Sequence, residues 1–527
     1  MITSRLIHSA LRAAGTLAAG ACLAPLAALA AGDGGTAAAV SQWPSYNNDL
    51  AGQRYSSLDQ INTKNVGGLK EICRVALSDG GSLQSGPLLV NGELYVTTAR
   101  DTFAIDPSNC KILWKSSYAA VGYEPFPVNR GAAYLNGRIF RGTPDGHLLA
   151  LDAKTGAVLW NNTAADSSYG EFLSAAPIAW NGLVFIGTAG SDWGIRGRMM
   201  AFDAESGREV WRFNTIPQGQ EKGASSWKIA HTAKTGGGGM WTSFTLDVRA
   251  GELFVPVGNP AADFLPADRP GDNLYTNSIV VLDAATGALK WYYQGIKNDQ
   301  WDYDLSAPAM LYRTKDRRDI VAAAGKDGYL HLVDRDSRKL LSKTSVTTQK
   351  KTADKPTAQG AFTCPGLLGG VEWNGPAFDA LSGSIMVGSV DWCTIHKAGK
   401  NEYTPGQLYY GGAPEMVKDP APRGWITAID GENGKLKWQY QTEAPVVAAV
   451  TPTAGGVVFS GDTAGNFFAL DSASGKLLMN TKLDGALGGG IITYSVGEKQ
   501  FVAATSGNVS RITFGGNGAP SIVVFGL

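Results

Sequence analysis

The sequence has 527 residues and a formal net charge of zero, because 46 Lys and Arg residues balance 46 Asp and Glu residues. A chain of this length can bury a large core, either as several ordinary domains or as one large β domain built from repeats. No long run of Lys or Arg occurs, which argues against nucleic acid or an anionic membrane surface as a partner. The 67 Gly and 14 Trp residues, with charged residues at only 17%, favour many short strands joined by tight turns.

The N-terminus has the pattern of an export signal. Two arginines precede an apolar run over 13–29 that is rich in Ala and Leu. The triplet Ala28-Leu29-Ala30 matches the small-x-small pattern for cleavage after Ala30. We therefore expect a signal peptide over 1–30, a linker over 31–42 and a mature chain that is exported to the periplasm.

The same apolar run leaves two alternatives. As a membrane anchor it is short and very rich in Ala, and no later stretch reaches the roughly 18 apolar residues that span a bilayer. Cys22 raises a lipoprotein alternative, but Ala19 stands where a lipobox normally has Leu or a β-branched residue. We therefore favour a cleaved signal and a mature chain without a membrane span.

Cleavage after Ala30 leaves an even number of cysteines, which in an oxidising compartment predicts two disulfides. Of the three pairings that four cysteines allow, we favour Cys73 with Cys110 and Cys364 with Cys393. No Cys-x-x-Cys-His motif occurs, so no c-type haem is expected to be attached to this chain.

A unit of strand, Asp, glycine-containing turn, strand and Trp recurs along the chain. The turn needs a left-handed residue, which Gly adopts without strain, and Thr-Gly, Ser-Gly or Asn-Gly stands there in most copies. The complete copies are Ala104-Ile105-Asp106 to Trp114, Ala150-Leu151-Asp152 to Trp160, Ala201-Phe202-Asp203 to Trp211, Val281-Leu282-Asp283 to Trp291, and Ala428-Ile429-Asp430 to Trp438. Weaker copies, which keep the Asp and lose the Trp, are Val333-Asp334 to Leu341, Phe378-Asp379 to Gly383, and Leu470-Asp471 to Met479.

These copies give eight units over roughly 480 residues, a period near the longer end for propeller blades. Because a four-stranded blade cannot bury both faces alone, blades must stack on one another. We therefore predict an all-β fold, a single eight-bladed β-propeller over 43–527, with the repeated tryptophans wedged between blades. Trp241 lies outside the repeat, and the glycine-rich, non-repetitive stretch 216–240 before it is typical of an inserted functional loop.

Three carboxylates, those of Asp299, Asp302 and Asp304, stand close together in Asn298-Asp299-Gln300-Trp301-Asp302-Tyr303-Asp304. In an isolated turn, such side chains would simply accept hydrogen bonds from their own backbone. Carboxylates this close, beside aromatic residues, need a cation or a proton.

The segments around this stretch carry a family resemblance. Arg269-Pro270-Gly271-Asp272-Asn273-Leu274-Tyr275-Thr276 upstream and Leu305-Ser306-Ala307-Pro308 downstream resemble the substrate-side blade of the pyrroloquinoline quinone (PQQ) dependent alcohol dehydrogenases. Trp43-Pro44-Ser45-Tyr46-Asn47-Asn48-Asp49 is similar to the entry signature of the same family. The resemblance implies oxidation of an alcohol, polyol or sugar with PQQ and a metal ion, and Asp302 as the catalytic base. Because the haem motif is absent, it also implies a separate periplasmic cytochrome c as the electron acceptor.

The resemblance also implies the other site residues, position by position. For the metal ion it implies Asp192, where Glu is usual, Asn259 and Asp302, with Asp304 as a further candidate. Calcium is expected ahead of a lanthanide ion, because carboxylate, amide and cofactor oxygens suit its loose coordination. For PQQ it implies Trp241 under the ring, Arg130 at a carboxylate, Lys326 near the quinone oxygen, and further contacts from Gln84, Ser174, Gly190 and Ser191.

Three positions depart from the family pattern. Glu124-Pro125 replaces two adjacent cysteines, Val447-Ala448-Ala449 replaces a segment with a Trp, and Gln84 stands where Glu is frequent. The role of Asp304 also has alternatives. An Asp at its position often marks lanthanide-dependent members, but sugar-type members carry it with divalent metals, and it could instead fill a gap left by the short Asp192.

A second reading is a non-enzymatic periplasmic scaffold of the outer-membrane assembly type. Such propellers use the same Asp-x-x-Thr-Gly-x-x-x-Trp hairpins, so this reading explains the repeats equally well. It leaves the segment from Arg269 to Asp304, together with Asp192 and Asn259, unexplained.

Overall fold

The computed structural model describes residues 42–77, 81–305, 307–510, 513–516 and 518–527, and these belong to one compact unit. The predicted signal peptide, the linker up to residue 41 and Cys22 lie outside the described residues. In the described part of the chain, no helix is long and apolar enough to cross a membrane.

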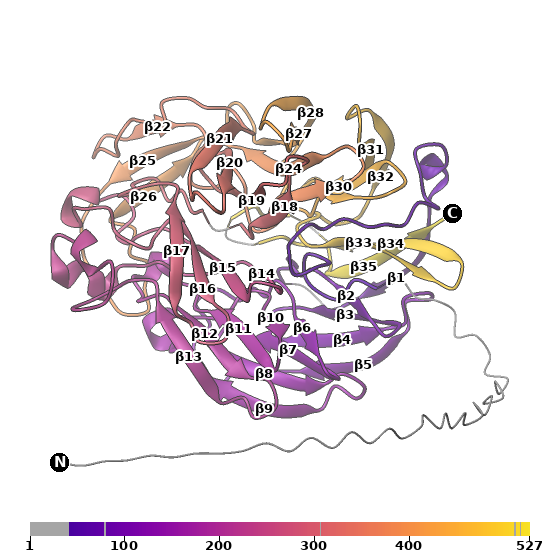
Figure 1. Ribbon diagram of the computed structural model, residues 1–527, viewed down its shortest axis with the longest axis horizontal. Coiled ribbons are helices and arrows are strands. Elements are labelled where there is room, and N and C mark those ends of the chain that lie inside the picture. Colours follow the sequence, from indigo (N-terminus) through magenta and orange to yellow (C-terminus); the bar gives the residue numbers. More distant parts are fainter. Residues whose placement is uncertain (1–41, 78–80, 306, 511–512, 517) are drawn as a thin grey trace, which may run out of the picture. The chain divides into compact units, whose positions relative to one another are not determined.

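Eight four-stranded sheets are formed by the described residues, and Figure 1 shows them following one another around a common centre. The first four blades are β2 (Leu88–Val90), β3 (Glu93–Thr97), β4 (Asp101–Ile105) and β5 (Ile112–Ser117); β6 (Ala133–Leu135), β7 (Arg138–Gly142), β8 (His147–Asp152) and β9 (Val158–Thr163); β10 (Ile178–Trp180), β11 (Leu183–Gly187), β12 (Arg198–Asp203) and β13 (Glu209–Asn214); and β14 (Thr245–Asp247), β15 (Glu252–Val257), β16 (Ser278–Asp283) and β17 (Leu289–Gln294).

The other four blades complete the ring. They are β18 (Met310–Arg313), β19 (Asp319–Ala324), β20 (Tyr329–Asp334) and β21 (Leu340–Ser345); β23 (Ala377–Asp379), β24 (Ser384–Asp391), β27 (Arg423–Asp430) and β28 (Leu436–Thr442); β29 (Thr451–Pro452), β30 (Val457–Gly461), β31 (Asn466–Asp471) and β32 (Leu477–Lys482); and β33 (Ile491–Val496), β34 (Lys499–Ser506), β35 (Ser521–Gly526) and β1 (Lys70–Ala76). The predicted eight-bladed β-propeller is confirmed.

The burial of each strand follows from its place in the blade. In the second blade, β8 is buried at every position except its two ends, because the neighbouring blades cover both faces. The outermost strand β9 has no buried residue and alternates between exposed and half-buried positions. Continuous apolar runs therefore form inner strands, and mixed sequences form the outer edge.

The repeated tryptophans lie between blades, as predicted. Trp114 Nε1 donates a hydrogen bond to the main-chain oxygen of Ala153 in the next blade at 3.0 Å, and Trp211 donates to Ala284 at 3.0 Å. A Cβ on Gly156 would come within 2.5 Å of the Trp114 ring, so the next blade needs glycine where the indole packs. Trp160 and Trp438 make the equivalent bonds to Ala204 and Ser472.

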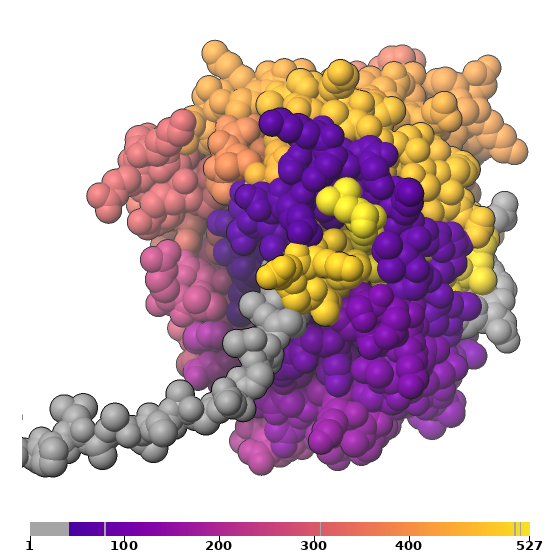
Figure 2. Space-filling model, turned by 90° about the vertical axis from the view of Figure 1, so that its right-hand side faces the viewer, coloured from indigo at the N-terminus to yellow at the C-terminus, as the bar shows by residue number. Residues whose placement is uncertain are grey.

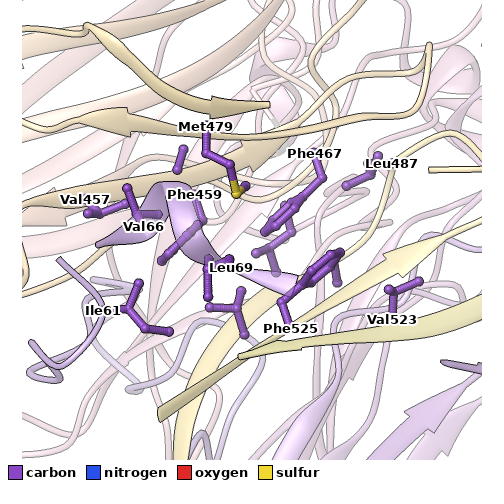
Figure 3. Packing of buried hydrophobic residues seen from close by; sticks show 14 of the residues in the cluster. Ile61, Val66, Leu69, Val457, Phe459, Phe467, Met479, Leu487, Val523 and Phe525 are labelled. Atoms are coloured by element: carbon purple, nitrogen blue, oxygen red, sulfur yellow. The ribbon is translucent and has the colours of Figure 1, made fainter. Parts of the chain in front are cut away.

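The ring closes by pairing the two ends of the described chain. Strand β1 is antiparallel to β35, so the last sheet takes its outer strand from the N-terminal side. Figure 2 shows the indigo N-terminal residues beside the yellow C-terminal residues on one face. A cluster of buried apolar side chains lies between this closing sheet and the blade before it. In this cluster Phe467 stacks on Phe525 with ring centroids 4.6 Å apart (Figure 3). This packing joins the seventh blade to the closing blade.

One repeat assignment is wrong, although the number of blades is right. Phe378-Asp379 to Gly383 and Ala428-Ile429-Asp430 to Trp438 are predicted as two units, but β23, β24, β27 and β28 form one sheet. The eighth blade is instead the closing sheet, which has no copy of the motif. The Asp379 turn is real, because its carboxylate accepts bonds from Leu381 N and Ser382 Oγ. A turn motif identifies a hairpin, but it does not identify the sheet that the hairpin joins.

A ninth, three-stranded sheet interrupts the sixth blade. It consists of β22 (Ala361–Thr363), β25 (Thr394–Ala398) and β26 (Gly412–Met416), and the repeat motif does not predict it. The structure contains the disulfides Cys73–Cys110 and Cys364–Cys393, so both predicted pairings are confirmed. Short 3-10 helices lie in the connections: η1 (Val66–Gly68), η2 (Ser167–Tyr169), η3 (Ser191–Trp193), η4 (Ala224–Ser226), η5 (Ala230–Thr235) and η6 (Pro266–Asp268).

Candidate active site

A cavity of about 520 Å³ is lined by every residue that the sequence analysis selected for the site. The volume is in the range of small-molecule and cofactor sites. These residues come from eight different connections between strands, although they are spread over residues 84–326. The eleven are Gln84, Arg130, Ser174, Gly190, Ser191, Asp192, Trp241, Asn259, Asp302, Asp304 and Lys326.

Asp302 is held in an unusual backbone conformation by its own loop. Its φ angle is 61°, in the left-handed region that non-glycine residues rarely adopt. The loop is fixed by Asp299, whose carboxylate accepts hydrogen bonds from Trp301 N at 3.1 Å and Tyr303 N at 2.8 Å. Of the three carboxylates in this stretch, Asp299 therefore forms the turn and Asp302 is presented to the cavity.

The segment from Arg269 to Thr276, upstream of this loop, serves as its support. The guanidinium group of Arg269 donates to the main-chain oxygen of Asp299 and, at 3.0 Å, to Asn273 Oδ1. Asn298 Nδ2 donates to the same Asn273 oxygen at 2.8 Å. Because all of these groups are buried or half-buried, the hydrogen-bond network fixes the conformation of the loop. Arg269 is thus a scaffold residue, and it does not line the cavity.

Lys326 is the cation that faces the buried carboxylates. Its Nζ lies 3.1 Å from Asp302 Oδ2 and 2.8 Å from Asp304 Oδ2. Burial lowers the pKa of Lys326, but Asp302 and Asp304 together raise it well above its ordinary value, so it stays charged. Burial raises the pKa of Asp302 well above its ordinary range, against the lowering effect of Lys326. A carboxylate with a raised pKa is a stronger proton acceptor.

Asp302 Oδ1 has no hydrogen-bond partner in the described part of the chain. Since Oδ2 is held by Lys326, one oxygen is anchored and the other is open to a ligand. A buried carboxylate oxygen without a partner is costly to the fold. The geometry therefore matches a group that accepts a proton or binds a cation.

Asp192 and Asn259 meet from two different loops. Asp192 lies in η3, and its Oδ1 accepts a hydrogen bond from Asn259 Nδ2 at 3.2 Å. This bond leaves the amide oxygen of Asn259 available as a hard ligand. Burial raises the pKa of Asp192 to about 6, with Lys326 opposing the shift and Asp304 adding to it.

Asp304 differs from Asp302 in having partners on both oxygens. Its Oδ1 accepts a hydrogen bond from Asn259 N at 2.6 Å, and its Oδ2 forms the ion pair with Lys326. The Asp304 carboxylate is therefore satisfied by the protein itself.

The glycine run before Trp241 places that side chain in the cavity. Gly237 N donates to Ile195 O at 2.8 Å, and Gly239 N donates to Ser191 Oγ at 2.8 Å. Gly237 and Gly238 both have positive φ angles, which glycine adopts at no steric cost. The predicted functional loop thus runs close against the Asp192 segment, and the indole of Trp241 emerges beside it.

Arg130 is stacked between aromatic rings, and among the described residues its guanidinium group bonds to a hydroxyl group and a main-chain oxygen rather than to a carboxylate. Its guanidinium carbon lies 4.7 Å from the Trp241 ring centroid and 5.1 Å from that of Trp373. One Nη donates to Ser174 Oγ at 3.0 Å and to Trp241 O at 2.8 Å. Burial lowers the pKa of Arg130 to about 10, so it remains a cation at neutral pH. An unpaired buried cation is suited to an anionic ligand.

The residues present fit a flat, polyanionic cofactor and a hard metal ion. Four residues that line the cavity each have a buried polar atom without a partner in the described structure: Gln84 Oε1, Arg130 Nε, Asp302 Oδ1 and Glu372 Oε1. The cavity also combines an indole face, two cations and a set of carboxylate and amide oxygens. These are the groups that a planar tricarboxylate such as PQQ and its metal ion require.

Sequence reasoning missed several residues of this site. Glu372, Trp373 and Tyr410 line the cavity, and the carboxylate of Asp263, which is not a lining residue, lies near those of Asp192 and Asp302. Asp263 stands four residues after Asn259, but this spacing by itself does not indicate a metal ligand. Glu372 and Tyr410 come from connections around the inserted sheet, for which the repeat gives no expectation.

Of the positions that depart from the family pattern, Gln84 and Pro125 line the cavity. Pro125 stands at one of the two positions where the family pattern has adjacent cysteines. Val447 is buried in an apolar cluster with Trp373, whose Nε1 donates to Gly488 O at 2.6 Å. An aromatic side chain from a different segment therefore packs in the same cluster as Val447.

Comparisons with known proteins agree with this geometry. The family model of the glucose/ethanol/alcohol dehydrogenase β-propeller domain matches residues 43–343. The dehydrogenase subunit of a quinone alcohol dehydrogenase from Gluconacetobacter polyoxogenes is 30% identical over 525 residues, which cover 88% of this chain and 71% of that protein. A lanthanide-dependent methanol dehydrogenase from Methylacidiphilum fumariolicum is also 30% identical, over 88% of this chain and 84% of its own.

The structural comparison covers nearly the whole described fold. A solved structure of a europium-containing methanol dehydrogenase superposes with a TM-score of 0.84 and 27% identity, over 92% of this chain and 98% of that one. A second family model, that of the outer membrane protein assembly factor BamB, matches residues 422–514, which contain blade hairpins and none of the eleven selected residues. On the combined evidence of sequence, fold and cavity, the chain belongs to the PQQ-dependent alcohol dehydrogenase family of β-propeller quinoproteins.

Proposed function

We propose that this protein oxidises an alcohol with PQQ and a hard metal ion in the periplasm, and that it passes the electrons to a separate cytochrome c. The observation that carries the proposal is Asp302, a buried carboxylate at the cavity with one oxygen on Lys326 and the other without a partner. The export pattern over 1–30 and the absence of a haem motif from the sequence support the compartment and the separate acceptor.

The cavity residues would hold the cofactor through different parts of the molecule. The indole of Trp241 would support the ring, Arg130 would bind a carboxylate, and Gln84, Ser174, Gly190 and Ser191 would offer further polar contacts. When bound, PQQ supplies the two-electron acceptor and the metal ion supplies a Lewis acid. Lys326 Nζ lies over the Trp241 ring, 5.4 Å from its centroid, and holds a positive charge beside that indole.

Asp302 is the proton acceptor of the reaction. An alcohol can lose its carbon-bound hydride only as its hydroxyl proton leaves, and a base within hydrogen-bond reach accepts that proton. Asp302 Oδ1 is the free acceptor, while Lys326 fixes Oδ2 and therefore fixes the direction of Oδ1. The positive φ angle of Asp302 is maintained by Asp299, which keeps the base on the cavity side of the loop.

The metal ion is proposed to lie among Asp192, Asn259 and Asp302. Carboxylate and amide oxygens are the ligands of hard cations such as calcium and lanthanides. Asp304 was a candidate ligand, and its two occupied oxygens support a different role, in which it orients Lys326 and the Asn259 backbone.

Reconstitution tests the function. The full chain is loaded with PQQ and either calcium or lanthanum, and dye-linked oxidation is measured with a panel of primary, secondary and polyol substrates. We expect dye reduction that requires both PQQ and metal and that is lost on chelation. Failure to retain PQQ, with no oxidation of any substrate, would contradict the proposal and favour the scaffold reading that the match to residues 422–514 keeps open.

A further inference from the structure

Asp263 is a buried acid without a partner. Its side chain is 1% exposed, and neither carboxylate oxygen has a hydrogen-bond partner in the described part of the chain. The nearby guanidinium of Arg269 does not pair with it, because its N–H groups bind the main-chain oxygens of Ala262, Asp263 and Asp299 and the side chain of Asn273. The fold therefore buries this carboxylate and gives it no donor.

The same carboxylate converges with two others. Oxygens of Asp192, Asp263 and Asp302 lie within 4.8 Å of one another. Three carboxylates at this distance repel one another unless a cation neutralises them. Protonation of Asp263 would remove one charge, and its O–H group could donate to a neighbouring carboxylate, but the carboxylates of Asp192 and Asp302 would still lie close together. A metal ion between the three carboxylates satisfies all of them at once.

Asp304 provides the contrast. It lies closer in sequence to the catalytic base than Asp263 does, yet its Oδ1 is held by Asn259 N at 2.6 Å and its Oδ2 by Lys326 at 2.8 Å. Asp304 is also outside the set of carboxylates whose oxygens converge. The unsatisfied charge in this site belongs to Asp263 and not to Asp304.

We propose that Asp263 is a metal ligand, which completes a set of four side chains with Asp192, Asn259 and Asp302. The inference rests on the proposed function, in which a hard metal ion lies beside PQQ. Three ligating carboxylates carry the charge that a trivalent lanthanide ion neutralises, whereas a divalent calcium ion leaves one negative charge buried. Asp263 therefore shifts the site toward a lanthanide ion.

Metal binding to the full chain, stripped with a chelator and free of PQQ, tests the inference directly. Terbium is titrated while its luminescence is excited through nearby tryptophans, and calcium is added in competition. We expect Asp263→Asn to weaken terbium binding at least tenfold and calcium binding by a smaller factor. Asp304→Asn is expected to change terbium binding less than threefold, and Asp336→Asn, which removes a carboxylate from an exposed turn, should not change it. Equal terbium affinity of Asp263→Asn and the parent, or a loss in Asp304→Asn as large as that in Asp263→Asn, would overturn the assignment.

Thermal unfolding separates ligation from a structural role. Without metal, Asp263→Asn should unfold at the same temperature as the parent or higher, because the variant lacks a buried unpaired charge. With terbium, the parent should gain stability and the variant should gain much less. A metal-free variant that unfolds well below the parent would make Asp263 structural and would overturn the proposal. These measurements need neither PQQ nor turnover, so a loaded parent protein that oxidises no alcohol would refute the proposed function alone.

Discussion

Aspartates in the blade hairpins and aspartates around the cavity have opposite environments. In the third blade, Asp203 accepts hydrogen bonds from the backbone N–H and the hydroxyl group of Ser206 at 2.8 and 2.7 Å, and these bonds lower its pKa. At the cavity, Asp263 and Asp302 have oxygens without partners, and burial raises the pKa of both well above the ordinary range. One residue type thus stabilises turns in one region and carries unsatisfied charge in the other. The fold gains nothing from the second arrangement, so it indicates function.

The largest expected effect comes from removing the charge of the base. Asp302→Asn keeps the size and one oxygen of the side chain but cannot accept the hydroxyl proton, so turnover should fall by at least about 100-fold. PQQ should still bind, since its proposed contacts come from other residues. Steady-state kinetics and a PQQ titration check the two parts. Activity above a few per cent of the parent would remove Asp302 from the role of base.

The second largest effect is expected for Trp241, the indole that is proposed to lie under the PQQ ring. Trp241→Ala removes a large flat contact, so PQQ affinity should fall by about 1–2 kcal/mol, which is roughly tenfold. Quenching of protein fluorescence by added PQQ measures the affinity. Trp114→Ala is the matched control, because that indole lies between blades and should affect the unfolding temperature while leaving PQQ affinity unchanged. A Trp241→Ala protein with parental affinity would show that the ring does not lie on this indole.

We expect the affinity for PQQ to depend on pH because the pKa of Glu372, which lines the cavity, is raised. Burial raises its pKa to about 7, with Lys326 opposing and Asp304 reinforcing the shift. Below pH 7 the carboxyl group is neutral, and above pH 7 its charge repels the carboxylates of PQQ. Glu372→Gln should therefore bind PQQ more tightly than the parent at pH 8.5 and equally at pH 5.5, as measured by titration at both values. The same affinity difference at both values would assign the effect to packing rather than charge.

The stability of the cofactor-free protein gives Glu372 a second readout. In the unfolded chain Glu372 has its ordinary pKa of 4.5, whereas in the folded chain its pKa is about 7, so the folded chain keeps the proton up to that pH. The folded state therefore binds more protons in this window, and the free energy of unfolding of the parent falls as pH rises from 4.5 to 7. Glu372→Gln should lack this fall, which denaturant unfolding at several pH values can detect.

The smallest effect is expected in a hairpin. Asp203→Ala removes the acceptor for its turn and should lower the unfolding temperature by no more than about 3 °C, without a change in kcat or PQQ affinity. Calorimetry and kinetics on the loaded protein check this expectation. A loss of activity in Asp203→Ala, with the fold intact, would contradict the conclusion that hairpin aspartates only stabilise turns.

The fold could be predicted from the sequence because its determinants are local. The Asp, Gly and Trp of each unit specify a hairpin and its contact with the next blade, as Trp114 and Gly156 illustrate. The closing blade and the inserted sheet of β22, β25 and β26 could not be predicted, because strand pairing between distant segments leaves no such motif. The hairpin at Asp379 was assigned to a blade of its own for the same reason.

The candidate site divides in a similar way. The eleven residues chosen by family resemblance all line one cavity, and their individual roles stay predictions. Asp263 and Glu372 could not be found by spacing alone. Their importance lies in burial and in the lack of a partner, and both properties depend on which other loops pack around them.

The absorbance spectrum of PQQ bound to the protein tests the central claim most directly. The full chain is loaded with PQQ and a lanthanide or calcium ion, freed of excess cofactor, and mixed with an alcohol in the absence of any electron acceptor. The account predicts that bound PQQ is reduced in a single turnover by the parent protein and stays oxidised in Asp302→Asn. A parent protein that retains no PQQ, or whose bound PQQ stays oxidised with every alcohol of the panel, would contradict it.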